Sequence, residues 1–330
     1  DSTAPFEKFG TEEPFNAQIS KHYYDKDLGK IVIEFATPLT TINESAFEGT
    51  AIGSIVLPEG ITTIEESAFE GSTLSEITIP GSMNNIGINV FYDCGNLSSV
   101  TFLPSPTKTP LNIGCLDWGP EWGPFYDSPL TSININRELI CVWEDGTVFT
   151  PTAWDEGIFA HKHYGSVGSV SVTLGPQVET LSNYMFNYLP IQTLTIPGTV
   201  KTIGNCVFDG CESLTSLTYE PSPTGEALTH GYNDDSDDDG PFYASPLTSV
   251  ILNREINYTY SSSAGNASEG LFGNRTTLTN VTIGKQVKTL SPYMFANSAI
   301  EELVIPGTVK TIGNCVFDGC ESLTSLTYEP

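Results

Sequence analysis

The chain has 330 residues, enough for two globular domains or for one long array of repeats. It carries 40 acidic and 13 basic side chains, and its formal charge of −27 disfavours nucleic acid and anionic membranes as partners. No run reaches the roughly eighteen apolar residues of a transmembrane segment, so none is predicted.

The first thirty residues contain no repeat. Because the chain starts at Asp1 without an initiator Met or an apolar signal region, we interpret it as a mature chain from which an export signal has been removed. We expect a flexible or tethering lead, followed by strands within Ile19–Phe35 that cap the first coil. The predicted domains are therefore a lead and cap at residues 1–30 and a repeat array at 31–330.

Large blocks of the array are duplicated. The segment Ile196–Pro221 returns unchanged as Ile305–Pro330, 109 residues later. The run PFYDSPLTS that follows Gly123 returns after Gly240 as PFYASPLTS, 117 residues later. Pro330 therefore falls in the middle of a copied block. Self-similarity of this kind is typical of solenoids.

A smaller unit repeats inside each block. Apolar residues recur at positions i, i+3 and i+5, as in Ile191/Leu194/Ile196, in Ile52/Ile55/Leu57 and, less regularly, in Ser169/Val172/Leu174. The last two residues of each triplet lie two apart, so they share one face of a predicted strand. A second apolar pair such as Val200/Ile203 follows, and then a phenylalanine that we expect to fill the interior of the coil. These phenylalanines, 22 residues apart where the spacing is tightest, are Phe47, Phe69, Phe91, Phe125, Phe159, Phe186, Phe208, Phe242, Phe272, Phe295 and Phe317.

These segments are rich in β-branched residues and interrupted by Pro and Gly, which argues against a helical repeat. We therefore predict a mainly-β leucine-rich-repeat solenoid, a curved right-handed superhelix with a parallel β-sheet and about eleven coils. Four insertions, near 103–124, 136–157, 220–241 and 253–270, depart from the 22-residue spacing and are predicted to be long loops.

The units AFEGTAIGSIVLP (46–58) and VFDGCESLTSLTY (207–219) resemble the leucine-rich repeats of the BspA-like family. The segment PFYASPLTSVILNREI (241–256) is similar to a variant repeat of that family, in which the strand ends in Arg. The resemblance implies a protein secreted by, or displayed on, anaerobic gut and oral bacteria or some protists. Some members of the family are adhesins for host matrix proteins. No functional residue carries over, because the shared motif forms the core.

The cysteines follow the repeat. The chain has seven, an odd number, so they cannot all pair within one molecule. Cys94, Cys211 and Cys320 share one position of the repeat, and Cys206 and Cys315 share another. We interpret them as buried thiols that pack between coils; disulfide bridges are the alternative.

One insertion contains a candidate cation site. Asp235, Asp237 and Asp239, followed by Gly240, match the opening of a calcium-binding loop, in which alternate carboxylates converge on one ion. The twelfth position is Pro246 rather than the Glu that completes an EF-hand. Calcium is therefore a hypothesis beside the simpler interpretation of a solvated acidic loop. His161 and His163 could form a metal-binding edge, but we interpret them as loop residues.

No catalytic motif is present in the sequence: there is no G-x-S-x-G elbow, phosphate-binding loop or dinucleotide fingerprint. None of the four histidines lies in a recognisable motif. We therefore predict that the protein is not an enzyme and that it has no cofactor, apart from the hypothetical calcium ion.

The predicted strand face offers small polar residues such as Thr218, Thr248 and Ser249, whereas aromatic residues concentrate in the insertions. Exposed together, the aromatic residues would form a protein- or glycan-binding patch; partly buried, they would only fasten the loops. We predict a monomeric, non-catalytic, secreted or cell-surface binding protein of the adhesin type. The alternatives are a glycan-binding module and a spacer that displays another domain. The candidate ligand-binding residues are Trp118, Trp122, Tyr126, Trp143, Trp154 and Tyr232, and Tyr258 belongs to the same group of insertion aromatics.

Overall fold

The computed structural model describes residues 14–27, 30–115, 124–143, 145–152, 157–159, 168–232, 240–258 and 267–330. Within these ranges the chain is built from short strands and turns, and its helical structure is one 3-10 turn, η2 (Ala267–Glu269). The predicted mainly-β class is therefore confirmed. The chain divides into two compact units, residues 1–130 with 140–149 and residues 131–139 with 150–330.

The first unit opens with an antiparallel hairpin. Strand β1 (Ile19–Asp25) pairs with β2 (Lys30–Phe35). The ring of Phe15 lies 5.0 Å from that of Phe35 and 5.8 Å from that of Phe47, measured between ring centroids. The hairpin segment therefore shares aromatic contacts with the first phenylalanine of the repeat.

Parallel strands follow in the first unit. The longer strands β5 (Glu76–Ile79) and β7 (Ser99–Phe102) pair in parallel. A second sheet has the strand order β10-β8-β6-β4-β3, and its strands are two to four residues long. These are β3 (Thr41–Ile42), β4 (Thr63–Ile64), β6 (Asn85–Ile86), β8 (Leu111–Gly114) and β10 (Leu139–Val142).

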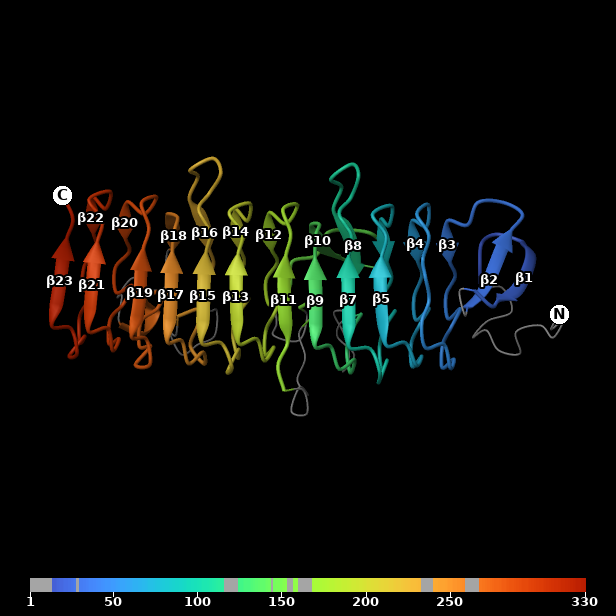
Figure 1. The fold of residues 1–330 in the computed structure, drawn as a ribbon, viewed down its shortest axis with the longest axis horizontal. Coiled ribbons are helices and arrows are strands. Elements are labelled where there is room, and N and C mark those ends of the chain that lie inside the picture. Colours follow the sequence, from blue (N-terminus) through green and yellow to red (C-terminus); the bar gives the residue numbers. More distant parts are fainter. Residues whose placement is uncertain are drawn as a thin grey trace. The chain divides into compact units, whose positions relative to one another are not determined.

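The second unit repeats the arrangement, and Figure 1 shows its long strands running in the same direction along consecutive coils. Its long strands are β9 (Ser132–Ile135), β11 (Ser171–Leu174), β13 (Thr193–Ile196), β15 (Ser216–Tyr219), β17 (Ser249–Leu252), β19 (Asn280–Ile283), β21 (Glu302–Ile305) and β23 (Ser325–Tyr328). Its short strands are β12 (Thr180–Leu181), β14 (Thr202–Ile203), β16 (Leu228–His230), β18 (Ile256–Tyr258), β20 (Thr289–Leu290) and β22 (Thr311–Ile312).

Stacked phenylalanines form the centre of both units. In the first unit the ring centroid of Phe69 lies 5.1 Å from that of Phe47 and 5.6 Å from that of Phe91, and the ring planes are within 9° of parallel. In the second unit Phe208 and Phe242 stack at 5.2 Å. The strands contribute alternate residues to the same core, as in β13, where Leu194 is 3% and Ile196 0% exposed. The predicted roles of the triplet and of the phenylalanine are therefore confirmed at these coils.

One predicted strand does not form. Residues 55–57 of the triplet Ile52/Ile55/Leu57 are not in a strand. The next coil forms its hydrogen bonds with residues that precede the expected strand. The backbone N–H groups of Thr73 and Ser75 donate to the carbonyls of Thr50 and Gly53, both at 3.1 Å. The apolar spacing was correct for burial of Leu57 (8% exposed), but the backbone there does not join the parallel ladder.

The cysteines are all free thiols, and five of the seven are buried. The Sγ atoms of Cys94, Cys211 and Cys320 donate hydrogen bonds of 3.0–3.2 Å to the carbonyls of Phe69, Phe186 and Phe295 in the preceding coil. Burial raises the pKa of the Cys94 thiol to about 11, so this group stays protonated near neutral pH. These thiols act as small core residues that also join neighbouring coils.

The two identical 26-residue segments lie in different surroundings. In the internal copy Leu217 and Tyr219 are both 0% exposed, whereas their counterparts Leu326 and Tyr328 are 50% and 55% exposed. Strand β15 has parallel neighbours on both sides, β13 and β17, whereas β23 pairs with β21 alone. The difference in burial therefore comes from packing against a second neighbour, since the sequences are the same.

Candidate functional site

Many of the predicted site residues lie outside the described residues. These are Trp118, Trp122 and Trp154 among the candidate ligand-binding residues, all three aspartates of the candidate calcium site (Asp235, Asp237, Asp239), and His161 and His163. Tyr126 and Trp143 belong to the first unit, and Tyr232 to the second.

The described aromatic residues each pack within their own unit. Tyr126 is half-buried and stacks on Tyr92, with centroids 5.8 Å apart and planes 8° from parallel. The ring of the half-buried Trp143 lies 4.2 Å from that of Phe149, measured between centroids. The two residues flank a turn in which the backbone N–H of Trp143 donates to the Thr147 carbonyl. These contacts fasten the two rings locally, and both rings keep part of their surface accessible.

Two other tyrosines serve the backbone and the core. The half-buried Tyr232 offers its carbonyl to the N–H of Cys206 at 3.0 Å. Tyr258 was predicted with the insertion aromatics, but it is only 7% exposed and its hydroxyl donates to the Glu269 carbonyl at 2.8 Å. Of the two alternatives for the insertion aromatics, a buried ring that fastens its loop describes Tyr258, because strand β18 turns this ring into the core.

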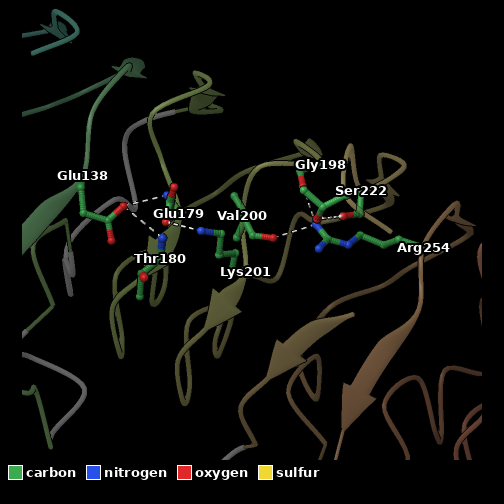
Figure 2. Close-up of polar contacts among 9 residues, drawn as sticks. Glu138, Glu179, Thr180, Gly198, Val200, Lys201, Ser222 and Arg254 are labelled. Carbon is green, nitrogen blue, oxygen red and sulfur yellow. Dashed lines mark hydrogen bonds and ion pairs between the residues drawn. The ribbon is translucent and has the colours of Figure 1, made fainter. Parts of the chain in front are cut away.

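A group that sequence reasoning did not single out is the set of buried arginines. The chain has three arginines, and Arg137, Arg254 and Arg275 are 0%, 1% and 6% exposed. Figure 2 shows Arg254, whose Nη1 donates to the carbonyls of Gly198 (3.2 Å) and Val200 (2.7 Å). Its Nη2 donates to the Glu226 carbonyl at 3.2 Å.

Arg254 therefore connects the end of β17 to the turn after β13 and to the insertion at 220–241. Burial lowers the pKa of its guanidinium, and the negative charge of Glu226 partly opposes that shift. Arg275 is used in the same way, since its guanidinium donates to the carbonyls of Gly273, Phe242 and Tyr243. A sequence signal existed, because the tripeptide Asn-Arg-Glu occurs at 136–138 and again at 253–255 in a chain with so few arginines.

The identical segments show what Arg254 displaces. In the second copy the Tyr328 hydroxyl donates to the Val309 carbonyl at 3.2 Å. In the first copy the equivalent carbonyl, that of Val200, accepts a hydrogen bond from Arg254, and the buried Tyr219 hydroxyl has no hydrogen-bond partner within the described part of the chain. An unpartnered buried hydroxyl costs free energy. The arginine contacts are therefore formed at the expense of a weaker hydrogen bond.

The glutamates of the Asn-Arg-Glu tripeptides also join coils. The Glu138 carboxylate accepts the N–H groups of Glu179 (2.7 Å) and Thr180 (3.1 Å) at the start of β12 (Figure 2). Burial raises the pKa of Glu138, and the two N–H donors oppose that shift. Glu255 accepts the N–H groups of Lys288 and Thr289 in the same manner. In the adjacent coil, Lys201 and Glu179 form an exposed ion pair at 2.7 Å (Figure 2).

Hydroxyls beside the strand face are likewise engaged between coils. The threonines that precede the long strands donate from Oγ1 to carbonyls of the preceding coil. These are Thr215 to Gln192, Thr248 to Thr215, Thr279 to Thr248 and Thr324 to Glu301. This row of threonines therefore contributes to coil stacking.

Among the described residues no group of three or more His, Cys, Asp or Glu side chains has a metal-binding arrangement. No helix in the same part of the chain has the length and apolarity needed to cross a membrane.

A family model described as the BspA type leucine-rich repeat region matches the chain in six copies, over residues 18–113, 158–226 and 238–330. These ranges include well over half of the sequence. The chain belongs to the BspA-type leucine-rich-repeat family. The resemblance drawn from residues 46–58, 207–219 and 241–256 is thereby confirmed, and with it the predicted fold class.

Several solved structures are similar to the chain at low sequence identity. A leucine-rich repeat protein from Bacteroides ovatus is 16% identical, with a TM-score of 0.42 and coverage of 94% of this chain and 92% of that one. The pneumococcal vaccine antigen PcpA is 18% identical, with a TM-score of 0.30 and coverage of 93% and 65%. A leucine-rich cell surface protein from Faecalibacterium prausnitzii is 15% identical, with a TM-score of 0.29 and coverage of 100% and 96%. No curated protein matches the sequence at a significant level.

Within this BspA-type solenoid, the contacts described above are structural. Arg254, Arg275, Glu138, Glu255 and three of the cysteines hold coils together.

Proposed function

We propose that this chain is a non-catalytic binding protein of a bacterial surface, or a secreted one, and that it acts as an adhesin toward host or matrix proteins. The proposal rests on the way the insertion at 220–241 is held at its base. Arg254 binds the Glu226 carbonyl, and the side-chain amide of Gln286 exchanges hydrogen bonds of 2.8 and 2.9 Å with the backbone of Ser222. A rigid base lowers the entropic cost of ordering a loop when it binds.

Membership of the BspA-type family supports the general role of a repeat scaffold, and one similar protein is described as a cell surface protein and another as a vaccine antigen. The formal charge of −27 favours partners with basic patches over nucleic acid or anionic membranes. A glycan ligand is the second candidate, since Tyr126 and Trp143 keep part of their ring surface accessible.

We expect the partner to engage the insertions rather than the strand face. The double substitution Trp118→Ala with Trp122→Ala should weaken binding at least tenfold, because aromatic anchors supply about 2 kcal/mol or more each at interfaces. The first measurement is a screen of the purified chain against immobilised matrix proteins and a glycan array. Surface plasmon resonance on the strongest hit then compares the variants.

The matched control is Thr218→Glu with Ser249→Glu, which places two charges on β15 and β17 without touching an insertion. We expect this control to bind as the unmodified chain does. Loss of binding in the control, with the tryptophan variant unaffected, would assign the site to the strand face. Absence of any hit, together with a display function for a fused domain, would favour the spacer alternative.

A further inference from the structure

His230 occupies a core position of the short-strand ladder. In β16 it pairs with Ile203 of β14 on one side and with Tyr258 of β18 on the other. It is 3% exposed. The equivalent inward position of the other short strands is aliphatic in Ile42, Ile64, Ile86, Leu181, Ile203 and Leu290.

The imidazole lies among aromatic rings. Its centroid is 5.6 Å from that of Phe242, 6.2 Å from Tyr258, 6.3 Å from Phe208 and 6.4 Å from Tyr219. The Nδ1 atom is 2.7 Å from the Gly231 carbonyl oxygen, which fits a neutral ring with its proton on Nδ1. The Nε2 atom is buried and has no hydrogen-bond partner among the described residues.

A second proton on this ring would reside on Nε2, for which the described residues supply no acceptor. The titratable groups packed against the ring are the phenols of Tyr219 (β15) and Tyr258 (β18), whose pKa values burial raises, so both stay uncharged in acid. Farther out lie the Arg254 guanidinium, which is bonded to the Val200 carbonyl, and the buried Glu269, whose carbonyl accepts the Tyr258 hydroxyl and whose negative charge contributes to the raised pKa of Tyr258. An imidazolium without an acceptor in such a place is costly.

We propose that His230 makes the coils around β14, β16 and β18 acid-sensitive, so that protonation of the imidazole opens this ladder and releases the base of the 220–241 insertion. The ladder β3-β4-β6 of the first unit has Ile42, Ile64 and Ile86 at the same position and therefore has no titratable side chain there. The inference is independent of the identity of any ligand.

The direction of the effect follows from proton linkage. Burial lowers the pKa of His230 from 6.5 to about 4, and the hydrogen bond to Gly231 only partly opposes it. When the β14-β16-β18 ladder is open, His230 therefore binds more protons between these two pH values than when the ladder is closed. The closed ladder loses stability as the pH falls from 6.5 toward 4. A fall from pH 6.5 to about 4.5 should therefore raise the equilibrium constant for opening of these coils about 40-fold. Well above pH 6.5 His230 contributes no pH dependence.

The test is hydrogen–deuterium exchange of the full chain at both ends of this window, corrected for intrinsic exchange rates. Peptides containing β14, β16 and β18 should lose about 40-fold protection against exchange at about pH 4.5 relative to pH 6.5. In His230→Leu, which installs the side chain found at Leu181, most of that loss should disappear. The comparison with a variant is needed because carboxylates also titrate as the pH nears the pI of 4.2.

His22→Leu, in the β1–β2 hairpin, is the matched control and should retain the acid response of β16. A nuclear magnetic resonance titration gives a second measurement that does not depend on a variant, and it should show His230 remaining neutral down to about pH 5. Equal loss of protection in the unmodified chain and His230→Leu, or titration of His230 near pH 6.5, would overturn the proposal.

Discussion

Phe208→Ala is expected to lower the free energy of unfolding by about 3–5 kcal/mol, because it removes a fully buried ring and leaves a cavity between coils. Phe208 is 0% exposed, and its ring stacks on Phe186 at 6.3 Å and on Phe242 at 5.2 Å. Urea unfolding, followed by circular dichroism, measures the change.

Phe317→Ala provides a control within the same molecule. Phe317 occupies the same place in an identical 26-residue segment, but it stacks on Phe295 alone and is only half-buried. We expect Phe317→Ala to lower the free energy of unfolding by less than half as much as Phe208→Ala, because the space that it leaves opens to solvent. Negligible effects at both positions would show that the phenylalanine column does not support the fold.

Arg254→Ala should destabilise the second unit by on the order of 3 kcal/mol, because it leaves the carbonyls of Gly198, Val200 and Glu226 without their donor. Tyr219 should recover part of this loss, since its hydroxyl can then reach the Val200 carbonyl, as Tyr328 reaches Val309. Thermal unfolding gives the magnitude. Hydrogen exchange in residues 197–200 and 222–228 shows whether the loss is local.

Two variants separate charge from geometry. Lys201→Ala removes an exposed cation from the adjacent coil and should change stability little. Arg254→Lys keeps a charge but supplies a single nitrogen where a planar fork contacts three carbonyls, so it should restore only part of the stability. If Arg254→Ala unfolds at the same temperature as the unmodified chain, the arginine does not hold the insertion in place.

The spacing of the apolar residues and the residue types of the repeat predicted the coil architecture well. The triplet Ile191/Leu194/Ile196 and the anchor Phe208 lie where the apolar spacing placed them, because one buried face per coil leaves little choice of register. The exact duplication of Ile196–Pro221 made the repeat recognisable without any structure. The exception at Ile55 arose because apolar spacing reports burial and does not report backbone pairing.

The polar contacts were harder to predict. Tyr258 counts as an insertion residue along the chain, yet strand β18 continues the core ladder into that insertion. Arg254 bonds to Gly198, 56 residues earlier, and such a partner has no signature in local sequence. A buried arginine whose two terminal nitrogens donate to carbonyls also contradicts the usual expectation that arginines lie on the surface. The candidate aromatic site and the calcium hypothesis remain predictions, since most of their residues lie outside the described part of the chain.

The hydrogen bonds of Arg254 and Gln286 connect coils that are not adjacent. Arg254 follows β17 and bonds to the turn after β13, and Gln286 follows β19 and bonds to Ser222 after β15, so each contact crosses an intervening coil. A solenoid in which coils touch only their neighbours would come apart one coil at a time when pulled from its ends. Here, hydrogen bonds join the coil of β13 to that of β17 and the coil of β15 to that of β19. No coil in this stretch can therefore unfold without breaking a contact to a coil beyond its neighbour. Under tension along the coils, this stretch would yield in one large step, at a higher force than coils that are joined only to their neighbours.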